Sequence, residues 1–481
     1  MNISRLAAAF IACAWLTGIP AKAELPDLGD VSRVAFSEQE EAQVGREIMR
    51  SIRNSPGWID APEINDYLSR LVDRLVRASD EPHRHFEVFL VRDTTINAFA
   101  LPGGFLGVHT GLIAAARSED ELAGVLAHEI AHVTQHHIAR MVQSTSGDSL
   151  AMLAALAIAV LAANSHPEVS NAALTTAQAS VMQGQINFTR LHEREADRVG
   201  LQILTRAGFD PAGIASFFER MMAQGRLYEI EATIYLRTHP LSHERMADLQ
   251  NRIQSDLRLR PKSDEFAWMQ AAVMSLDGNA VQASKAFKSR VQASPGEPAL
   301  HYGLALAALR NHDVEQAQTA LAHLRAQTQL SEFLQARQAM LAARIAEQSG
   351  GAAAALPALQ KAQARLPGDQ PLAYLLAEIL LRANQPELAR RLIETRLSTW
   401  PEDARLYRQL AQAELALGKR LQSHMAQAEA YRLEGLLEAA LEQLQIGLRT
   451  GQGDFYTLSI ADSRIKALRD QLRDTATKKK H

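Results

Sequence analysis

The sequence is almost free of cysteine: Cys13 is the only one in 481 residues. A single thiol excludes a disulfide framework within the chain, and it leaves no basis for dithiol redox chemistry. Aromatic residues are also few, at 5%, and an excess of positive charge is absent, since the formal net charge is −3. This balance argues against nucleic acid as a partner, and the short basic tail at residues 478–480 does not change it.

Long hydrophobic runs are missing as well. Residues 150–163 are the most apolar segment beyond the N-terminus, and they are too few to span a bilayer. We interpret this segment as a buried core helix. A flap that moves over a cleft or lies against a membrane surface is the alternative.

The N-terminus has the pattern of a secretory signal peptide. Arg5 precedes the apolar residues 6–19, and Ala21-Lys22-Ala23 is a small-x-small cleavage site. We therefore expect residues 1–23 to be removed and the mature chain to reach the periplasm. Lipoprotein processing before Cys13 is the alternative, although the leucine expected three residues earlier is absent.

Among the residues that are present, the segment H-E-I-A-H at residues 128–132 carries the most specific chemistry. On a helix, positions i and i+4 share one face, so His128 and His132 can bind one tetrahedral Zn²⁺. Glu129 can then act as the general base for a water molecule that attacks a peptide carbonyl. The motif predicts a zinc-dependent peptidase.

The residues around this motif predict that it lies on a helix. Ser118 and Glu121 have the spacing of a capping box. Apolar residues at helical spacing follow, and they extend the predicted helix to about residue 140. The two histidines would therefore have the geometry that metal binding requires.

A zinc site of this kind needs a third protein ligand, which we expect on a later helix. Glu193 and Asp197 are four residues apart, so they share a helix face. Glu193 would bind the metal, and Asp197 would accept the other ring N–H of a ligating histidine or serve as a proton donor. An ordinary charged helix with i,i+4 ion pairs is the alternative.

These motifs resemble the zinc metallopeptidase family that includes the type I CAAX prenyl protease and the bacterial heat-shock membrane metalloprotease. Besides residues 128–132 and 193–197, the resemblance rests on N-A-F-A-L-P-G-G at 97–104 and T-H-P at 238–240, followed by Arg245. It covers residues 36–255 and is only architectural beyond them. The signal peptide and the helical repeats make the chain similar to periplasmic members that serve outer-membrane β-barrel assembly.

The resemblance implies one zinc ion per chain, bound by His128, His132 and Glu193, with Glu129 as the general base. It implies that Asp197 is a proton donor or orients a ligating histidine. The same resemblance gives the chain a zincin-like fold, in which the metal helix lies beside a small sheet.

Three further roles follow from the resemblance. Arg245 would stabilise the oxyanion of the tetrahedral intermediate. His239 would fill the open zinc position and silence the enzyme, unless it only packs beside the site or helps to bind substrate. Residues near Asn97 would form an edge strand that binds the substrate backbone, unless Asn97 only caps a turn. His136 would extend the face of the two ligating histidines by one turn, and we interpret it as a partly buried polar residue near the site.

From about residue 264 the sequence becomes repetitive. Alanine, a large apolar residue four positions later and a proline eight positions beyond it recur from Ala283, Ala355 and Ala389. The last two alanines are 34 residues apart, the tetratricopeptide period. A unit from Ala317 lacks the proline, and a degenerate unit runs past Gly418. The pattern predicts an α-solenoid whose concave face binds extended segments or partner proteins, with an alanine-rich helical bundle as the alternative.

The predicted fold is therefore mainly α with a small β-sheet (α+β). We expect helices at 37–54 and 62–79 and strands at 86–91, 96–100 and 105–109. The predicted organisation is a signal peptide at 1–23, a zinc metallopeptidase domain at 24–260, a tetratricopeptide-repeat domain at 264–450, and a C-terminal helix with a basic tail at 451–481.

The predicted function is that of a periplasmic zinc metalloendopeptidase. By resemblance, its substrates would be unfolded or misassembled envelope proteins, with outer-membrane β-barrels as clients and the barrel-assembly machinery as a partner. The same scheme includes association with the periphery of the outer membrane. The alternative is a chaperone or scaffold whose protease site is mostly latent. Glu129 argues against a purely structural zinc site, because such a site needs no general base.

Overall fold

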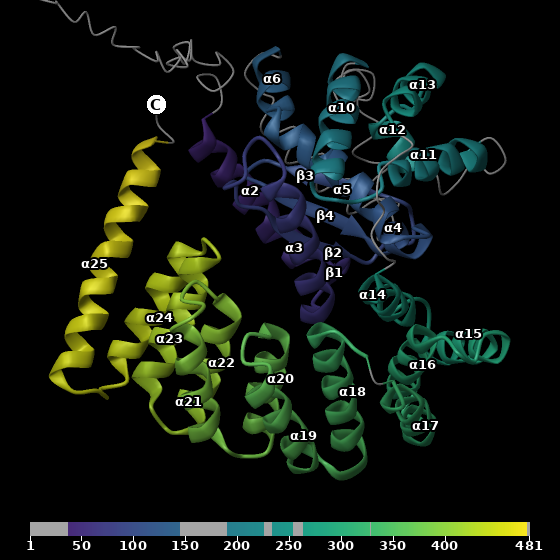
Figure 1. The fold of residues 1–481 in the computed structure, drawn as a ribbon. Helices are drawn as coiled ribbons and strands as arrows, with labels where there is room; N and C mark the ends of the chain where they lie inside the picture. The colour runs from purple at the N-terminus through teal and green to yellow at the C-terminus, as the bar shows by residue number, and fades with distance from the viewer. Residues whose placement is uncertain (1–36, 145–189, 226–232, 254–262, 328, 479–481) are drawn as a thin grey trace, which may run out of the picture.

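The structure is a computed structural model that describes residues 37–144, 190–225, 233–253, 263–327 and 329–478 (Figure 1). The predicted signal peptide, Cys13 and the apolar segment 150–163 lie outside the described residues. None of the helices in the described ranges is both long enough and apolar enough to cross a membrane.

The N-terminal half combines a small sheet with helices, as predicted. Its elements are α2 (Glu38–Arg53), β1 (Trp58–Ile59), α3 (Pro62–Arg77), β2 (Glu87–Val91), β3 (Ala98–Leu101), β4 (Phe105–His109), α4 (Thr110–Ala115), α5 (Glu119–Thr134), α6 (His137–Ser144), α10 (Arg190–Arg206), α11 (Ala212–Gly225), α12 (Thr233–Thr238) and α13 (His243–Arg252). The short β1 was not predicted. The predicted end of the motif helix was wrong, because α5 stops at Thr134 and a separate helix follows.

The sheet is mixed, with strand order β1-β2-β4-β3. Strands β2 and β4 run parallel, whereas β1–β2 and β3–β4 are antiparallel. Successive side chains of each strand point to opposite faces of the sheet, as the two-residue period of a strand requires. Phe89 and Phe105 pack with α2 on one face, while Leu90 and Leu106 join α3 and α5 in the main core on the other.

Both predicted helix starts occur, but only one has the full capping box. At α2, the Ser37 hydroxyl accepts the Glu40 N–H and the Glu40 carboxylate accepts the Ser37 N–H. At α5, Ser118 accepts the Glu121 N–H at 3.2 Å. The carboxylate of Glu121 instead accepts the N–H of Arg117, so the predicted return bond was wrong.

The C-terminal half is an arc of helices (Figure 1). Its elements are α14 (Asp264–Ser275), α15 (Ala280–Ala293), α16 (Pro298–Arg310), α17 (Val314–Arg325), α18 (Glu332–Gly350), α19 (Ala352–Arg365), α20 (Gln370–Arg382), α21 (Pro386–Leu397), α22 (Ala404–Ala416), α23 (Arg420–Leu433), α24 (Leu437–Arg449) and α25 (Phe455–Lys478). Consecutive helices pack against each other. The repeat alanines Ala317, Ala355 and Ala389 are fully buried between these packed helices. This arrangement confirms the predicted α-solenoid.

The first solenoid helices share a core with the N-terminal half. One cluster of buried residues runs from Leu68 of α3 and Leu126 of α5 to Trp268 of α14 and Phe333 of α18. Later repeats have hydrophobic clusters of their own. The beginning of the arc is therefore anchored to the N-terminal half by apolar packing.

Candidate metal centre

Helix α5 carries the H-E-I-A-H motif in the interior of the protein. The side chains of His128, Glu129 and His132 are each at most 2% exposed. Helix α10 packs directly on α5, and Gly200 makes this possible, because a Cβ there would lie 3.1 Å from the Cα of His128. The close approach of the two helices brings Glu193 next to the two histidines.

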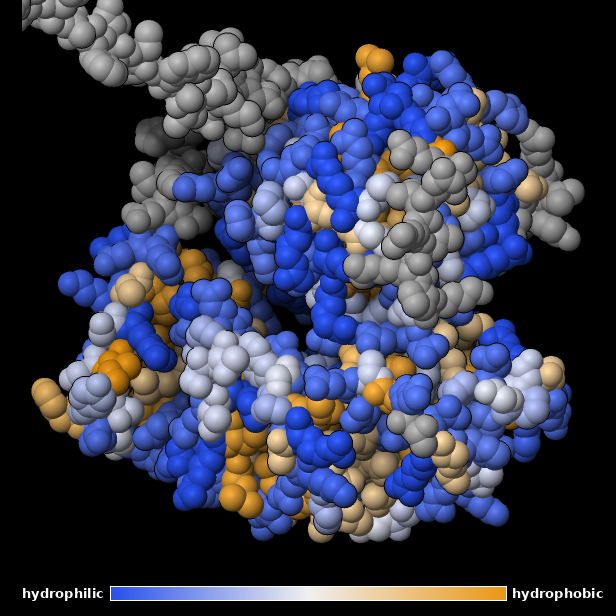
Figure 2. All heavy atoms as spheres, viewed as in Figure 1, coloured by the Kyte–Doolittle hydropathy of each residue, from blue (hydrophilic) through white to orange (hydrophobic). Residues whose placement is uncertain are grey.

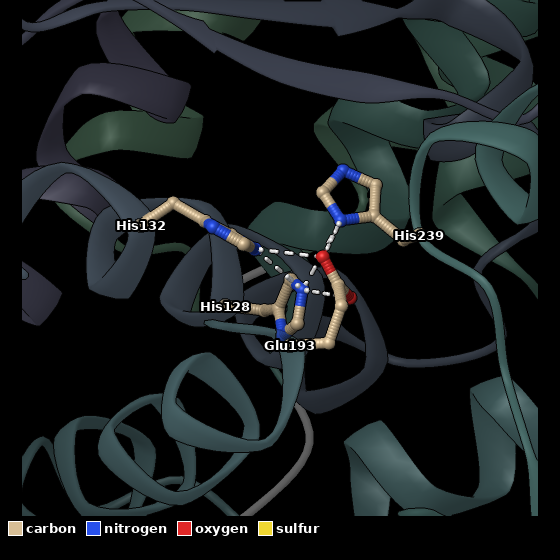
Figure 3. A group of neighbouring side chains, drawn as sticks. All are labelled: His128, His132, Glu193 and His239. Atoms are coloured by element: carbon tan, nitrogen blue, oxygen red, sulfur yellow. Dashed lines mark hydrogen bonds and ion pairs between the residues drawn. The ribbon is translucent and has the colours of Figure 1, made fainter. Parts of the chain in front are cut away.

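Four predicted ligands converge on one point: His128, His132, Glu193 and His239 (Figure 3). The Nε2 atoms of His128 and His132 are 3.1 Å apart. Glu193 Oε1 lies 3.4 Å from His132 Nε2 and 3.1 Å from His239 Nδ1. His239 Nδ1 lies 3.4 Å from His128 Nε2.

These separations fit a tetrahedral metal. Zn–N bonds of about 2.0–2.1 Å place neighbouring ligand atoms about 3.3 Å apart. Imidazole nitrogens with a carboxylate oxygen form a donor set that suits zinc. All four side chains are buried, so a cation there would also compensate groups that water does not reach. The residues present therefore fit a metal ion.

Asp197 and Arg245 lie behind the ligands. Asp197 Oδ1 is 3.2 Å from Nδ1 of His128, the position that an orienting carboxylate occupies. Arg245 holds Asp197 with two hydrogen bonds of 2.7 Å, from Nε and Nη2. Its Nη1 lies 2.8 Å from Glu193 and donates to the carbonyl of Pro240. The arginine thus fixes both carboxylates, and its predicted oxyanion role stays a prediction.

The pKa values of the two glutamates of the site, Glu129 and Glu193, are shifted in opposite directions. Burial raises the pKa of Glu129, and the nearby histidines only partly oppose this. Burial alone would also raise the pKa of Glu193, but His239 and His128 hold it well below its usual range. Glu193 is therefore a carboxylate suited to a cation, whereas Glu129 is closer to a group that takes up a proton.

Two residues near the centre were missed by the sequence analysis. Tyr235 is fully buried, and its ring stacks on His239 at 4.7 Å. His137, and not His136, contacts the centre, since its Nδ1 lies 2.8 Å from Nδ1 of His132. His136 is partly buried, as predicted, but it points to Glu81. The missed signal was the adjacent pair of histidines, which a helix end can direct to different sides.

The predicted substrate strand is an edge of the sheet. Strand β3 is the last in the strand order, and it packs near α5. Asn97 precedes it and is buried, and its carbonyl accepts the N–H of His109. The position is compatible with both interpretations of Asn97, and strand addition by a substrate stays a prediction.

Comparisons with known proteins agree with this centre. The family model described as peptidase family M48 matches residues 62–253. The beta-barrel assembly-enhancing protease of Escherichia coli O157:H7 is 32% identical over 457 residues, which cover 93% of this chain and 91% of that protein. A Vibrio cholerae relative is 36% identical over 306 residues, which are 63% of each chain.

Among solved structures, yeast Tom70 matches with a TM-score of 0.29 and 11% identity, over 74% of this chain and 82% of that one. The E. coli relative covers almost the whole of the present sequence at more than 30% identity. Together with the match to the family model, this similarity shows that the chain belongs to peptidase family M48.

Proposed function

We propose that this member of the family is a zinc metalloendopeptidase of the bacterial cell envelope. The observation that carries the proposal is the convergence of His128, His132, Glu193 and His239 on one point beside Glu129. This combination supplies both a metal site and an adjacent proton acceptor. A structural site would need only the first.

In this proposal the ion, when bound, supplies a Lewis acid for water and the peptide carbonyl. Glu129 takes the proton from the attacking water at its carboxylate and gives it to the leaving amine. Its raised pKa assists the uptake. Asp197 keeps His128 oriented, and Arg245 keeps Asp197 and Glu193 in place through its hydrogen bonds and ion pair.

We propose that His239 is an inhibitory ligand of the same centre, called the latch below. Its Nδ1 takes a position in the ligand tetrahedron, while its Nε2 lies 3.4 Å from Oε1 of Glu129. A histidine in this place occupies the space that a water molecule needs next to the general base. Activity would then require that the segment carrying His239 moves away.

Location and clients are proposed on the similarity to beta-barrel assembly-enhancing proteases and on the N-terminal sequence pattern. We propose a periplasmic protein that cleaves misassembled envelope proteins, with outer-membrane β-barrels as clients, association with the periphery of the outer membrane, and the barrel-assembly machinery as a partner. A cleft of about 1180 Å³ between the two halves would serve recruitment. It is lined by Trp58 of the sheet and by Tyr374, Trp400 and Arg405 of the solenoid, and Figure 2 shows a hollow between the halves.

The decisive experiment compares the wild type with Glu129→Gln. The wild type should contain about one zinc per chain and hydrolyse casein. Glu129→Gln should keep the metal but lose hydrolysis by about 10²–10⁴-fold, the usual share of general acid–base catalysis. An inactive, metal-free wild type would refute the proposal and favour the chaperone or scaffold role.

The latch has a separate test with His239→Ala on the same unfolded substrate. Faster cleavage and self-cleavage would support it. Slower cleavage would mean that the histidine serves catalysis, and the latch would have to be abandoned.

A further inference from the structure

The turn between α5 and α6 has an unusual backbone. Helix α5 ends at Thr134, and His136 has a φ of 51°, in the left-handed region. Such a conformation is unfavourable for a residue other than glycine. It directs the next residue, His137, back along α5, where its ring lies 4.8 Å from the ring of His132. The side chain of His137 is fully buried.

The hydrogen bonds of this pair have only one consistent direction if His132 binds the metal. His132 presents Nε2 to the other ligands, so its proton must be on Nδ1. That Nδ1–H then donates to Nδ1 of His137 at 2.8 Å. His137 must in turn carry its proton on Nε2, which lies 3.1 Å from Oε2 of Glu195.

The far end of this chain of hydrogen bonds is also held. Arg140 of α6 donates to Glu195 of α10 from Nη1 and Nη2, both at 3.0 Å. The ring of His192 stacks on His137 at 4.5 Å with an interplanar angle of 20°. His137 is therefore held between His132 of α5 on one side and Glu195 and His192 of α10 on the other.

We propose that His137 is a positioning residue of the metal centre, which fixes the tautomer and orientation of His132 and is itself held by Glu195. The proposal rests on the proposed metallopeptidase function. It makes the two ligating histidines unequal, because His128 meets the carboxylate of Asp197 directly and His132 meets a carboxylate through a second imidazole. Outer partners of this kind typically change metal affinity or activity by about 10–100-fold.

The test replaces His137 in the full mature protein in two ways. His137→Leu removes the acceptor for His132 Nδ1–H, whereas His137→Asn keeps an acceptor oxygen near the position of Nδ1. Three quantities are to be measured. They are zinc affinity by competition with a chelator, kcat and KM on a peptide substrate, and the visible spectrum of the cobalt-substituted protein. His137→Leu should weaken zinc binding by about 10–100-fold, lower kcat more than it raises KM, and change the cobalt spectrum.

Recovery of zinc binding in His137→Asn would distinguish a positioning role of His137 from a role in packing alone. His137→Asn should recover most of the affinity and the wild-type spectrum, and Glu195→Gln should give a smaller loss than His137→Leu. His136→Asn is the matched control, because asparagine tolerates the left-handed backbone and the side chain of His136 faces Glu81. This control should bind zinc like the wild type.

Two results would overturn the proposal. One is wild-type zinc affinity in a folded His137→Leu protein. The other is equal loss in His137→Leu and His137→Asn with an equal fall in the melting temperature of the metal-free forms, which would reveal packing alone. If the wild type itself binds no zinc, the proposed function fails first, so the two failures are distinguishable.

Discussion

The catalytic half and the solenoid are both built from packed helices, yet they bury different chemistry. Around α5 and α10, fully or nearly fully buried side chains include ionisable ones with mutual contacts: His128, His132, Glu193, Asp197, His239 and Arg245. In the later repeats, the buried clusters consist mainly of alanine and leucine. Most ion pairs there have at least one exposed partner, such as Arg391–Glu387, whereas Arg337–Asp369 is a buried exception. Packing in the first region holds charges at fixed distances, and in the second it excludes water.

The glycines show the same contrast. Gly200 faces the backbone of α5 at His128. Gly296 and Gly368, in loops of the solenoid, have no atom within 4 Å of the place where a Cβ would be. The catalytic half therefore needs close backbone approach to assemble its centre. The solenoid uses glycine mainly between helices, so the same substitution should have unequal effects in the two regions.

The largest effect is expected from Glu193→Ala. Loss of a ligand should weaken zinc binding by more than the about 10–100-fold that an outer partner contributes, and hydrolysis should fall with it. The measurement is metal content after dialysis together with casein hydrolysis. The matched control is Glu414→Ala, which removes a buried glutamate of the solenoid and should leave the metal content unchanged. Retained stoichiometric zinc in Glu193→Ala would place the third ligand elsewhere.

The next largest effect is expected from Gly200→Ala. The new methyl group meets backbone atoms of His128 at 3.1 Å, so α10 must shift away from α5. We expect a loss of about 2–3 kcal/mol in the free energy of unfolding and weaker zinc binding, since Glu193 moves with α10. Gly296→Ala should change stability by less than about 0.5 kcal/mol. Equal effects of the two substitutions in denaturant titrations would remove the contrast between the regions.

Arg344→Ala tests the ion pair between the halves. Arg344 Nη1 lies 2.8 Å from Oε1 of Glu63, a nearly buried carboxylate on α3. Removal should cost about 2 kcal/mol at neutral pH, because Glu63 is left without its charged partner. Arg391→Ala, on an exposed face, should leave the unfolding transition unchanged. If Arg344→Ala also left the unfolding transition unchanged, apolar packing alone would join the halves.

The same pair predicts a pH dependence. Burial alone would raise the pKa of Glu63, but Arg344 overcomes this and lowers it below its usual range. The contribution is therefore fully present above the unfolded value of about 4.3 and is lost as the pH falls through the lowered folded pKa. The difference in stability between wild type and Arg344→Ala should shrink below about pH 4. A difference that grows in acid would contradict the assignment.

The smallest effect is expected within the solenoid, from Pro357→Ala. Pro357 is exposed and lies inside α19, beyond its first turn, where it cannot donate a backbone hydrogen bond. Alanine should restore this bond and raise stability by about 1 kcal/mol without changing zinc content or hydrolysis. Thermal unfolding checks the prediction, and a destabilised variant would show that the proline shapes the helix for a neighbour.

What could be predicted from the sequence is what short-range spacing encodes. The i,i+4 spacing of His128 and His132, that of Glu193 and Asp197, and the recurring alanines each require only a helix to have meaning. These patterns predicted the metal helix, the later ligand helix and the solenoid. The resemblance to a known family supplied His239 and Arg245, because their distance along the chain leaves no local pattern.

Tertiary structure decided what depends on where helices end and how they meet. The left-handed backbone of His136 follows the end of the motif helix and turns His137 towards His132. No periodicity in the sequence indicates this turn. Likewise, Arg245 turns to Asp197 and Glu193 because α13 packs on α10. The predicted division near residue 260 does not separate two cores, since Trp268 and Phe333 belong to the same cluster as Leu126. Burial is shared between distant segments, and only the folded chain determines which segments share it.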